Sequence, residues 1–244
     1  MYNILLTIAY DGTRYSGWQR QLNGASVQGE IEASLEKLFK KPIKITGASR
    51  TDAGVHAAGQ RAGFFLDNIT VPLEKLPYAL NASLPADIAV TKAEPAPAGL
   101  HPRFSAKRKI YAYAVYNNRI RNPLNNRAWH VRPALDAARM AKASQYLIGT
   151  HDFKTFCASG TETVNFIRTV NALTFDINGP LITFCIDGDA FLYNMVRIIA
   201  GTLVYAGLGK INPDDMPAII ASKNRGAAGM TAPPHGLTLL EIIY

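Results

Sequence analysis

Residues 165–186 read NFIRTVNALTFDINGPLITFCI, and this stretch decides the fold class. Apolar and polar residues alternate from Asn165 to Asp176 and again from Leu181 to Ile186, which is the pattern of half-buried strands. Between them, Asn178-Gly179-Pro180 is composed of turn-forming residues. The stretch therefore predicts two strands that pair antiparallel through a tight turn.

The rest of the chain mixes strands and helices without strict alternation, which favours an α+β fold with a largely antiparallel sheet. Tyr2–Tyr10 alternates like a strand, and Ser26 is a suitable N-cap for a helix with an apolar stripe over Val27–Phe39. Further strands are predicted near Ile43–Ile45 and over Gln60–Leu66, Asp87–Ala93, Lys107–Tyr116 and Leu237–Tyr244, and further helices over Leu76–Leu84, Pro133–Ile148 and Leu192–Tyr205.

The proline-containing segment Glu94–Pro102 is predicted to link two halves, 1–103 and 104–244, which resemble each other in element order. A length of 244 residues suits one large domain or two of about 120 residues. With 48% hydrophobic and 18% charged residues, the composition excludes a disordered, collagen-like or coiled-coil protein.

Targeting signals are not found in the sequence. No apolar run reaches the roughly 20 residues of a membrane span, and Met1–Tyr10 does not resemble a signal peptide. Only two cysteines occur, Cys157 and Cys185, too few for a disulfide-stapled scaffold or a thiolate metal site. We therefore expect a cytoplasmic protein without membrane association.

The charge distribution points to a polyanionic partner. The formal net charge is +8, and no Asp or Glu occurs between Pro95 and Leu135. Arginines and lysines interleaved with aromatic residues suit a nucleic acid, because cations meet phosphates and rings stack on bases. A generically basic surface is the alternative. The cations of this stretch are Arg103, Lys107, Arg108, Lys109, Arg119, Arg121, Arg127 and Arg132, and its aromatic residues are Phe104, Tyr111, Tyr113, Tyr116 and Trp129.

The segment Gly47–His56 places an arginine, a carboxylate and an imidazole between two predicted strands. Asp52 in this segment could be a nucleophile or a general base, or it could cap a tight turn. For His56 a structural role is favoured over a functional one.

Arg197 is the only charged residue from Ala190 through Gly209, within a predicted core helix. Arginine keeps its charge and is rarely buried without a partner, so it should face a carboxylate or an anionic ligand. Asp52 is a good candidate for that carboxylate. A structural ion pair or an arginine that reaches solvent at the helix edge is the alternative.

Other signals are weak. Gly207-Leu208-Gly209-Lys210 follows a predicted helix rather than opening one, so the end of a helix explains it better than a phosphate-binding loop. The five histidines lack the spacing of metal ligands, and there is no glycine-rich dinucleotide motif after a strand. Neither a metal nor a nucleotide cofactor is indicated.

Taken together, these segments resemble the tRNA pseudouridine synthase A family. The resemblance rests on Tyr10-Asp11-Gly12-Thr13 with Gly17-Trp18-Gln19, Ser49-Arg50-Thr51-Asp52-Ala53-Gly54-Val55-His56-Ala57, Phe104-Ser105-Ala106 leading to Tyr111, His151-Asp152-Phe153, Phe191-Leu192-Tyr193-Asn194-Met195-Val196-Arg197, and Ala232-Pro233 to Gly236-Leu237. The block around Asp52 is highly specific, and the others are weak alone.

The resemblance implies an enzyme that isomerises uridine to pseudouridine at tRNA positions 38, 39 and/or 40, in the anticodon stem-loop. It implies three catalytic residues: Asp52 as the catalytic aspartate, Arg197 paired with Asp52, and Tyr111, which would stack on the target base and assist proton transfer. It implies that Arg50 helps to push the uridine out of the stem and occupies its place. Candidate substrate-binding residues are Arg50, Tyr111, Trp18, Gln19, Arg20, His56, Arg103, Lys107, Arg108 and Lys109, although Trp18 suits the core equally well.

The family also implies a homodimer in which one tRNA contacts both subunits, and no cofactor. We expect two similar halves, each a mainly antiparallel sheet with helices on one face, that meet at a central RNA-binding cleft. Two other functions stay open. A non-catalytic RNA-binding protein or RNA chaperone would have a structural Asp52, and a nucleoside hydrolase would release free uracil.

Overall fold

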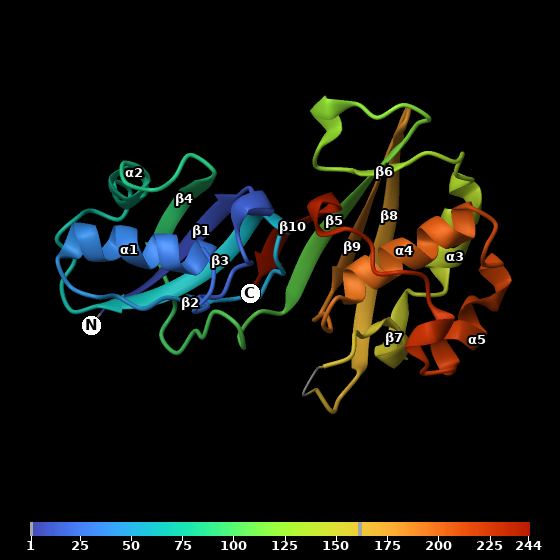
Figure 1. Cartoon of the computed structure of the whole chain (residues 1–244). Coiled ribbons are helices and arrows are strands. Elements are labelled where there is room, and N and C mark those ends of the chain that lie inside the picture. Colours follow the sequence, from blue (N-terminus) through green and yellow to red (C-terminus); the bar gives the residue numbers. More distant parts are fainter. Residues whose placement is uncertain (1, 161–162) are drawn as a thin grey trace. The chain divides into compact units, whose positions relative to one another are not determined.

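The computed structural model describes residues 2–160 and 163–244, which form an α+β protein as the sequence predicts (Figure 1). The chain divides into two compact units. The first contains the residues up to Lys107 together with Thr238–Tyr244, and the second contains Arg108–Leu237. This grouping differs from the predicted halves at the C-terminus, because the last strand pairs with a strand of the first unit.

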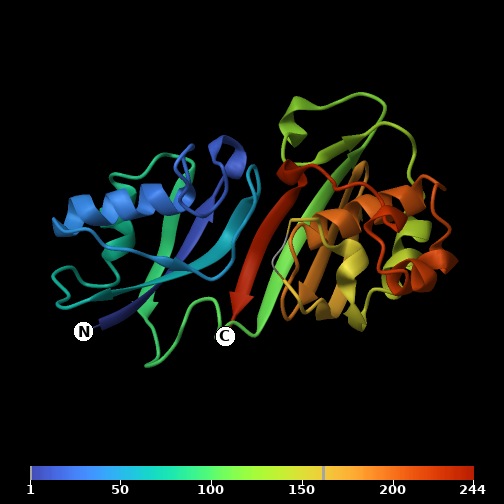
Figure 2. The same ribbon diagram turned by 60° about the horizontal axis from the view of Figure 1, so that its bottom comes forward.

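The sheet of the first unit has the order β4-β1-β3-β10, and β2 pairs with β3. Neighbouring strands are antiparallel except β10 and β3, which are parallel. Helices α1 and α2 lie on the same side of this sheet (Figure 2). The elements are β1 (Tyr2–Tyr10), α1 (Val27–Phe39), β2 (Thr46–Gly47), β3 (His56–Leu66), α2 (Leu76–Asn81), β4 (Ile88–Pro95) and β10 (Leu237–Ile243).

Local sequence signals explain the first strand and helix. Ile4, Leu6 and Ile8 of β1 are fully buried, as their alternation predicts. The side chain of Ser26 accepts a hydrogen bond from the Gly29 N–H at 3.2 Å, which confirms the predicted N-cap of α1. The strand predicted near Ile43–Ile45 is wrong by a few residues, since it occupies Thr46–Gly47.

The sheet of the second unit has the order β5-β9-β8-β7, and β6 runs parallel to β5. The predicted hairpin is confirmed as β8 and β9, which are antiparallel, with Gly179 at φ 56° in the turn. The elements are β5 (Arg108–Asn117), β6 (Trp129–Val131), α3 (Ala137–Gln145), β7 (Gly149–Asp152), β8 (Ile167–Asn178), β9 (Leu181–Gly188), α4 (Met195–Gly207) and α5 (Met216–Ala221).

Two predicted helices begin later than expected. Helix α3 begins at Ala137 rather than near Pro133, because the Asp136 carboxylate caps it by accepting the Arg139 N–H at 3.0 Å. Helix α4 begins at Met195, after Asn194 in the left-handed conformation at φ 60°. Single 3-10 turns occupy Gly12–Arg14, Pro123–Asn125, Phe153–Phe156, Pro213–Asp215, Arg225–Ala227 and Pro234–Gly236. Within the described residues, no helix has the length and hydropathy needed to cross a membrane.

Candidate functional site

The segment between β2 and β3, residues 48–55, contains Asp52 and is called the aspartate loop below. A buried glutamine fixes its beginning. The Gln60 side chain accepts the Ser49 N–H at 3.1 Å and donates to the Ser49 carbonyl at 2.7 Å. The Ala48 N–H also donates to the Arg61 carbonyl at 2.8 Å. The sequence gives no signal for this role of Gln60, because it depends on how β3 pairs with the loop.

The segment that follows β1 fixes the middle of the aspartate loop. The Tyr10 hydroxyl and Thr51 Oγ1 are 2.7 Å apart, and the Trp18 N–H donates to the Thr51 carbonyl at 3.0 Å. The Gly54 N–H donates to the Tyr15 carbonyl at 3.3 Å. Because these contacts join residues 10–18 to residues 48–55, two of the motifs that carry the resemblance form one structural unit.

Gly17 permits this close approach. It has φ +100°, and a Cβ there would lie 2.6 Å from the Thr51 carbonyl oxygen. Only glycine adopts this backbone without strain and leaves room for the loop.

Asp52 begins a tight turn in the loop and is half-buried. The Val55 N–H donates to the Asp52 carbonyl at 3.2 Å, and Gly54 has φ +77°, as a glycine at the third position of a turn permits. Arg50, two residues earlier, is exposed. The fixed backbone on both sides of the turn gives the Asp52 side chain a defined starting point, which a reacting group requires.

His56 is the first residue of β3 and is buried. Its Nδ1 accepts the Gly12 N–H at 3.0 Å and lies 3.1 Å from Asp11 Oδ1. Nδ1 therefore contacts both a backbone N–H and a carboxylate of the segment that follows β1. The contacts favour the structural interpretation of His56, and its burial gives no support to the predicted role in substrate binding.

The three neighbouring candidates Trp18, Gln19 and Arg20 divide into core and surface. Trp18 is 2% exposed and packs against Tyr10 with ring centroids 6.1 Å apart, so it is a core residue rather than a surface contact for RNA. Gln19 and Arg20 are exposed, and Arg20 Nη1 lies 3.5 Å from Glu32.

Asp87 forms hydrogen bonds with Arg14 and Tyr15, in the segment that follows β1. Its carboxylate accepts the Tyr15 hydroxyl at 2.7 Å and Arg14 Nε at 2.7 Å. Although burial raises the pKa of Asp87, the hydrogen bonds from Tyr15 and Arg14 hold it below the ordinary value of 3.8. The charged form is therefore the one that the fold stabilises.

We expect Asp87→Asn to lower the free energy of unfolding at pH 7 by about 1–2 kcal/mol, because a charged acceptor of two hydrogen bonds is lost. Because the pKa of Asp87 is lower in the folded state than in the unfolded state, its ionised carboxylate stabilises the fold at pH values above the unfolded-state pKa. This stabilisation is lost as the pH falls through the folded-state pKa. Urea unfolding of the variant and the wild type at pH 7 and pH 3 measures the difference between their free energies of unfolding. An equal difference between the variant and the wild type at both pH values would contradict this account of Asp87.

In the second unit, the candidate stacking residue Tyr111 lies on β5 opposite Ile186 of β9. Its ring contacts Phe191 edge-on, with centroids 5.3 Å apart and planes at 88°. Since the backbone is held in the sheet and the ring rests against Phe191, the side chain has little rotational freedom. The side chain is only 6% exposed, so a base that stacks on Tyr111 must do so on the small exposed part of the ring.

Arg197 lies in the first turn of α4 and is held by two neutral oxygens. Its Nε donates to the Ala232 carbonyl at 2.8 Å, and its Nη1 donates to Asn194 Oδ1 at 2.7 Å. The Ala232 N–H returns a hydrogen bond to the Arg197 carbonyl at 3.1 Å. These acceptors orient the guanidinium. Asp52 belongs to the first unit and Arg197 to the second, so their pairing stays a prediction.

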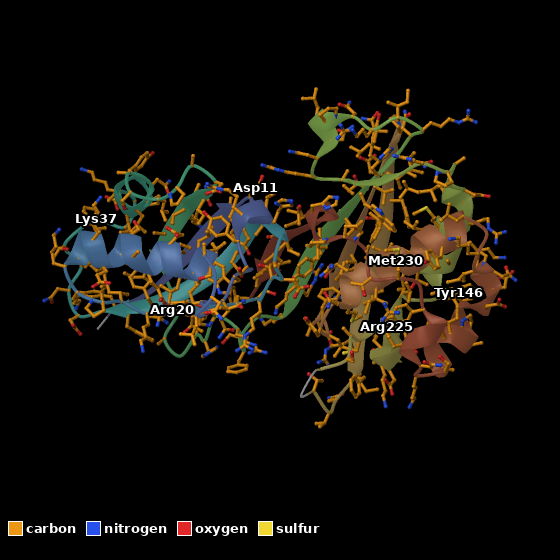
Figure 3. All side chains as sticks on the ribbon, in the orientation of Figure 1. Asp11, Arg20, Lys37, Tyr146, Arg225 and Met230 are labelled. Carbon is orange, nitrogen blue, oxygen red and sulfur yellow. The ribbon has the colours of Figure 1, made fainter. Side chains whose placement is uncertain are left out.

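The segment 225–236, called the strap below, lies along α4 and supplies Ala232. Its Met230 and Arg225 are labelled in Figure 3. The Gly229 N–H donates to Thr202 Oγ1 at 2.9 Å, and Arg225 Nη1 donates to the Gly229 carbonyl at 2.8 Å. The motif Ala232-Pro233 to Gly236-Leu237 includes the end of the strap, but no local pattern shows that the strap contacts Arg197.

The four basic candidates near the start of β5 differ in availability. Arg108 forms a two-point ion pair with Asp187, and this hydrogen bonding holds the pKa of the Asp187 carboxyl below its ordinary value. A phosphate would therefore compete with Asp187 for Arg108. Arg103 and Lys107 are exposed, and Lys109 is half-buried.

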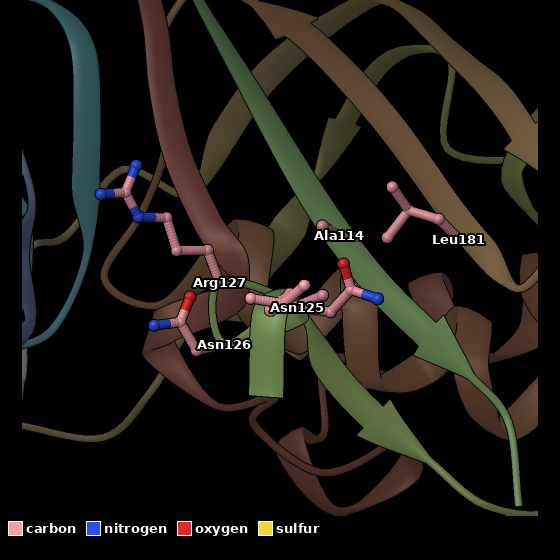
Figure 4. Close-up of a pocket in the computed structure, with 7 residues that line it drawn as sticks. Ala114, Asn125, Asn126, Arg127 and Leu181 are labelled. Atoms are coloured by element: carbon pink, nitrogen blue, oxygen red, sulfur yellow. The ribbon is translucent and has the colours of Figure 1, made fainter. Parts of the chain in front are cut away.

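The loop between β5 and β6 bears Arg119, Arg121 and Arg127, and Arg132 follows β6; all four are exposed. A hollow of about 380 Å³ lies at the base of this loop (Figure 4). It is lined by Ala114, Leu124, Asn125, Asn126, Arg127, Ala128 and Leu181. None of the predicted catalytic residues lines it, so the hollow belongs to the basic surface rather than to the proposed chemistry. In the described part of the chain, no group of three or more His, Cys, Asp or Glu residues is arranged to hold a metal ion.

Comparisons with known proteins agree with the motifs. A profile of the family described as tRNA pseudouridine synthase matches residues 6–105 and 143–244. The tRNA pseudouridine synthase A of Thermoanaerobacter sp. (strain X514) is 48% identical over 245 residues, covering 100% of both chains. The proteins of the same name from Moorella thermoacetica and Caldicellulosiruptor saccharolyticus are 46% and 44% identical and cover 98% and 100% of both chains.

Proposed function

Since this chain belongs to the tRNA pseudouridine synthase family, we propose that it isomerises uridine to pseudouridine in the anticodon stem-loop of tRNA, at positions 38, 39 and/or 40. The match of the family profile to both compact units carries the isomerase assignment. The rigid turn at Asp52 within the matched region supports the choice of reacting residue. The choice of the anticodon stem-loop follows from the resemblance of the motifs.

The reaction breaks the bond between the ribose carbon C1′ and N1 of uracil and forms a bond from the same carbon to C5. N1 gains a proton and C5 loses one, so no water or electrons are consumed overall. Asp52 would attack the ribose carbon or remove a ribose proton, and both routes use a carboxylate. We propose that Arg197 pairs with Asp52, and that the neutral oxygens of Asn194 and Ala232 aim the guanidinium.

The target base must leave its stack before it can react, which costs a few kcal/mol. We propose that Tyr111 stacks on the extruded uracil, which offsets about 1–3 kcal/mol of that cost. Arg50, an exposed residue of the aspartate loop, would occupy the space that the base leaves. We further propose that two copies of the chain form a homodimer and share one tRNA.

Mapping pseudouridine in unmodified tRNA before and after incubation with the purified protein tests the proposal. We expect new pseudouridine at one or more of positions 38, 39 and 40. Pseudouridine at other positions only would overturn the anticodon assignment, and free uracil without pseudouridine would indicate a hydrolase.

The basic loop provides a test of RNA contact. In the described residues, Arg119, Arg121 and Arg132 take part in no ion pair, so their charges can meet phosphates. We expect their joint replacement by Gln to reduce the slope of log affinity against log salt by about 2–3, because fewer counterions are released. Binding of tRNA at several salt concentrations measures this slope.

A matched control removes three exposed lysines of the first unit, Lys37, Lys40 and Lys75, which lie outside the basic stretch. It lowers the net charge by the same amount, and we expect the slope to stay near that of the wild type. If both triple variants change the slope equally, overall charge rather than the basic loop determines binding.

A further inference from the structure

Phe104 is the most exposed phenylalanine among the described residues. Its side chain is 77% exposed, whereas that of Phe65 is 59% exposed and those of Phe64, Phe153, Phe156 and Phe184 are at most 1% exposed. An exposed phenyl ring gains nothing from the hydrophobic effect within its own chain. Its position therefore calls for a separate explanation.

The ring is held in place by a closed turn. His101 stacks on it with ring centroids 4.4 Å apart and planes at 29°. The imidazole Nδ1 accepts the backbone N–H groups of Arg103 and Phe104, each at 3.2 Å. The Ser105 hydroxyl accepts the His101 N–H at 3.0 Å, and the Ser105 N–H donates to the His101 carbonyl at 3.0 Å. One side of the phenyl ring thus rests on His101, and its orientation is fixed.

Positive charge surrounds the ring. The Arg103 guanidinium carbon is 5.7 Å from the ring centroid, and Lys107 is exposed three residues further along. Among the described residues, neither cation takes part in an ion pair. No acidic residue occurs in the sequence from Pro95 through Leu135. An acidic or apolar protein surface would satisfy only one of these features, whereas an unpaired nucleotide offers a phosphate and a flat base together.

We propose that Phe104, mounted on His101 and flanked by Arg103 and Lys107, is a stacking platform for an unpaired base of the substrate RNA. The inference rests on the proposed function, since it takes tRNA as the ligand. It adds a second aromatic contact to that of Tyr111, on a different unit of the protein. Phe104 binds RNA and takes no part in the chemistry, so it should affect KM rather than kcat.

The experiment compares Phe104→Ala, Phe104→Leu and Phe104→Trp with the wild type. Stacking is worth about 1–3 kcal/mol per base, so Phe104→Ala should weaken tRNA binding by about 5- to 150-fold. Phe104→Leu keeps an apolar side chain without a ring and should show most of that loss, whereas Phe104→Trp should restore affinity. We expect kcat at saturating tRNA to be unchanged in all three.

Tyr78 gives a matched control, because it is an aromatic residue of the same unit that is 78% exposed. Tyr78→Ala should bind tRNA as the wild type does, and thermal melting should show that none of the variants loses its fold. If Phe104→Ala or Phe104→Leu binds tRNA with wild-type affinity, the proposal that Phe104 stacks on a base is wrong. A change in oligomeric mass by light scattering, with unchanged RNA affinity, would overturn it in favour of a contact between subunits. Pseudouridine formation by the wild type in the same assay tests the proposed function independently.

Discussion

Replacing Asp52 with Asn is expected to abolish pseudouridine formation while leaving tRNA affinity unchanged. The amide has almost the shape of the carboxylate, so the turn at residues 52–55 should persist, with its hydrogen bond from the Val55 N–H to the Asp52 carbonyl. An amide cannot serve as a nucleophile or a base, so we expect the rate to fall by at least about 10⁴-fold. Tritium release from tRNA labelled at uridine C5 measures the rate directly.

Asp67→Asn is a suitable control, because Asp67 is an exposed carboxylate of the same unit that pairs with Lys41 at 2.9 Å. It should release tritium at the wild-type rate. Residual release by Asp52→Asn at more than a few per cent would show that another residue carries the reaction. If the wild type binds tRNA but releases no tritium, a non-catalytic RNA-binding protein explains the chain better than an enzyme does.

The parts of the fold that the sequence predicted well are those determined within a few residues. Strand β1 occupies the predicted Tyr2–Tyr10, because alternation alone separates its two faces. Helix α1 begins after Ser26, because the capping hydrogen bond reaches only to Gly29. The hairpin of β8 and β9 follows from the turn residues between them.

Boundaries set by contacts between distant residues were predicted less well. Pro133 is compatible with a first helical turn, but the Asp136 cap places the start of α3 at Ala137. Strand β3 begins at His56 rather than at Gln60, because it also pairs with β10 from the other end of the chain. The C-terminal strand joins the first unit for the same reason. No window of neighbouring residues contains that information.

The candidate site shows the same division. The types of reacting residue are visible in the motifs, but their supports are not. The sequence is as compatible with a core position for Trp18 as with an RNA contact, and it favours a structural role for His56. The structure buries both side chains, and His56 Nδ1 accepts the Gly12 N–H. Arg108 looks available for phosphate, and Asp187, 79 residues away in the sequence, engages it. Charge and aromatic content predict a binding surface, whereas pairing within the fold decides which residues can contribute to it.

The second large effect is expected at Gly201, about one helical turn after Arg197 on α4. A Cβ at Gly201 would lie 1.8 Å from the Met230 carbonyl oxygen, which is backbone and cannot turn away. Gly201→Ala must therefore displace the strap, and the strap carries the Ala232 carbonyl that accepts Arg197 Nε. Overpacking of this kind costs about 1–3 kcal/mol of stability, and a displacement of about 1 Å at a reacting group can cost about 100-fold in rate. We expect a lower Tm together with a lower kcat measured well below that Tm.

Gly207→Ala on the same helix separates the two effects. Its Cβ would lie 2.8 Å from Cγ of the buried Met140 side chain, so this variant also overpacks α4, but against a residue outside the strap. This variant should keep the wild-type kcat. If Gly201→Ala lowers Tm but not kcat, the strap is only structural.

A double-mutant cycle with Arg197→Lys shows whether the strap acts through Arg197. Lysine has no planar fork to bridge the Ala232 carbonyl and Asn194 Oδ1 in the same way, so Arg197→Lys alone should lower kcat with little change in Tm. If the strap matters because it aims this guanidinium, adding Gly201→Ala to Arg197→Lys should lower kcat little further, since the group it positions is already lost. If Gly201→Ala lowers kcat by the same factor in the Arg197→Lys background as in the wild type, the strap instead positions some other group. The glycine contact between α4 and Met230 then acts on catalysis by a route that excludes Arg197.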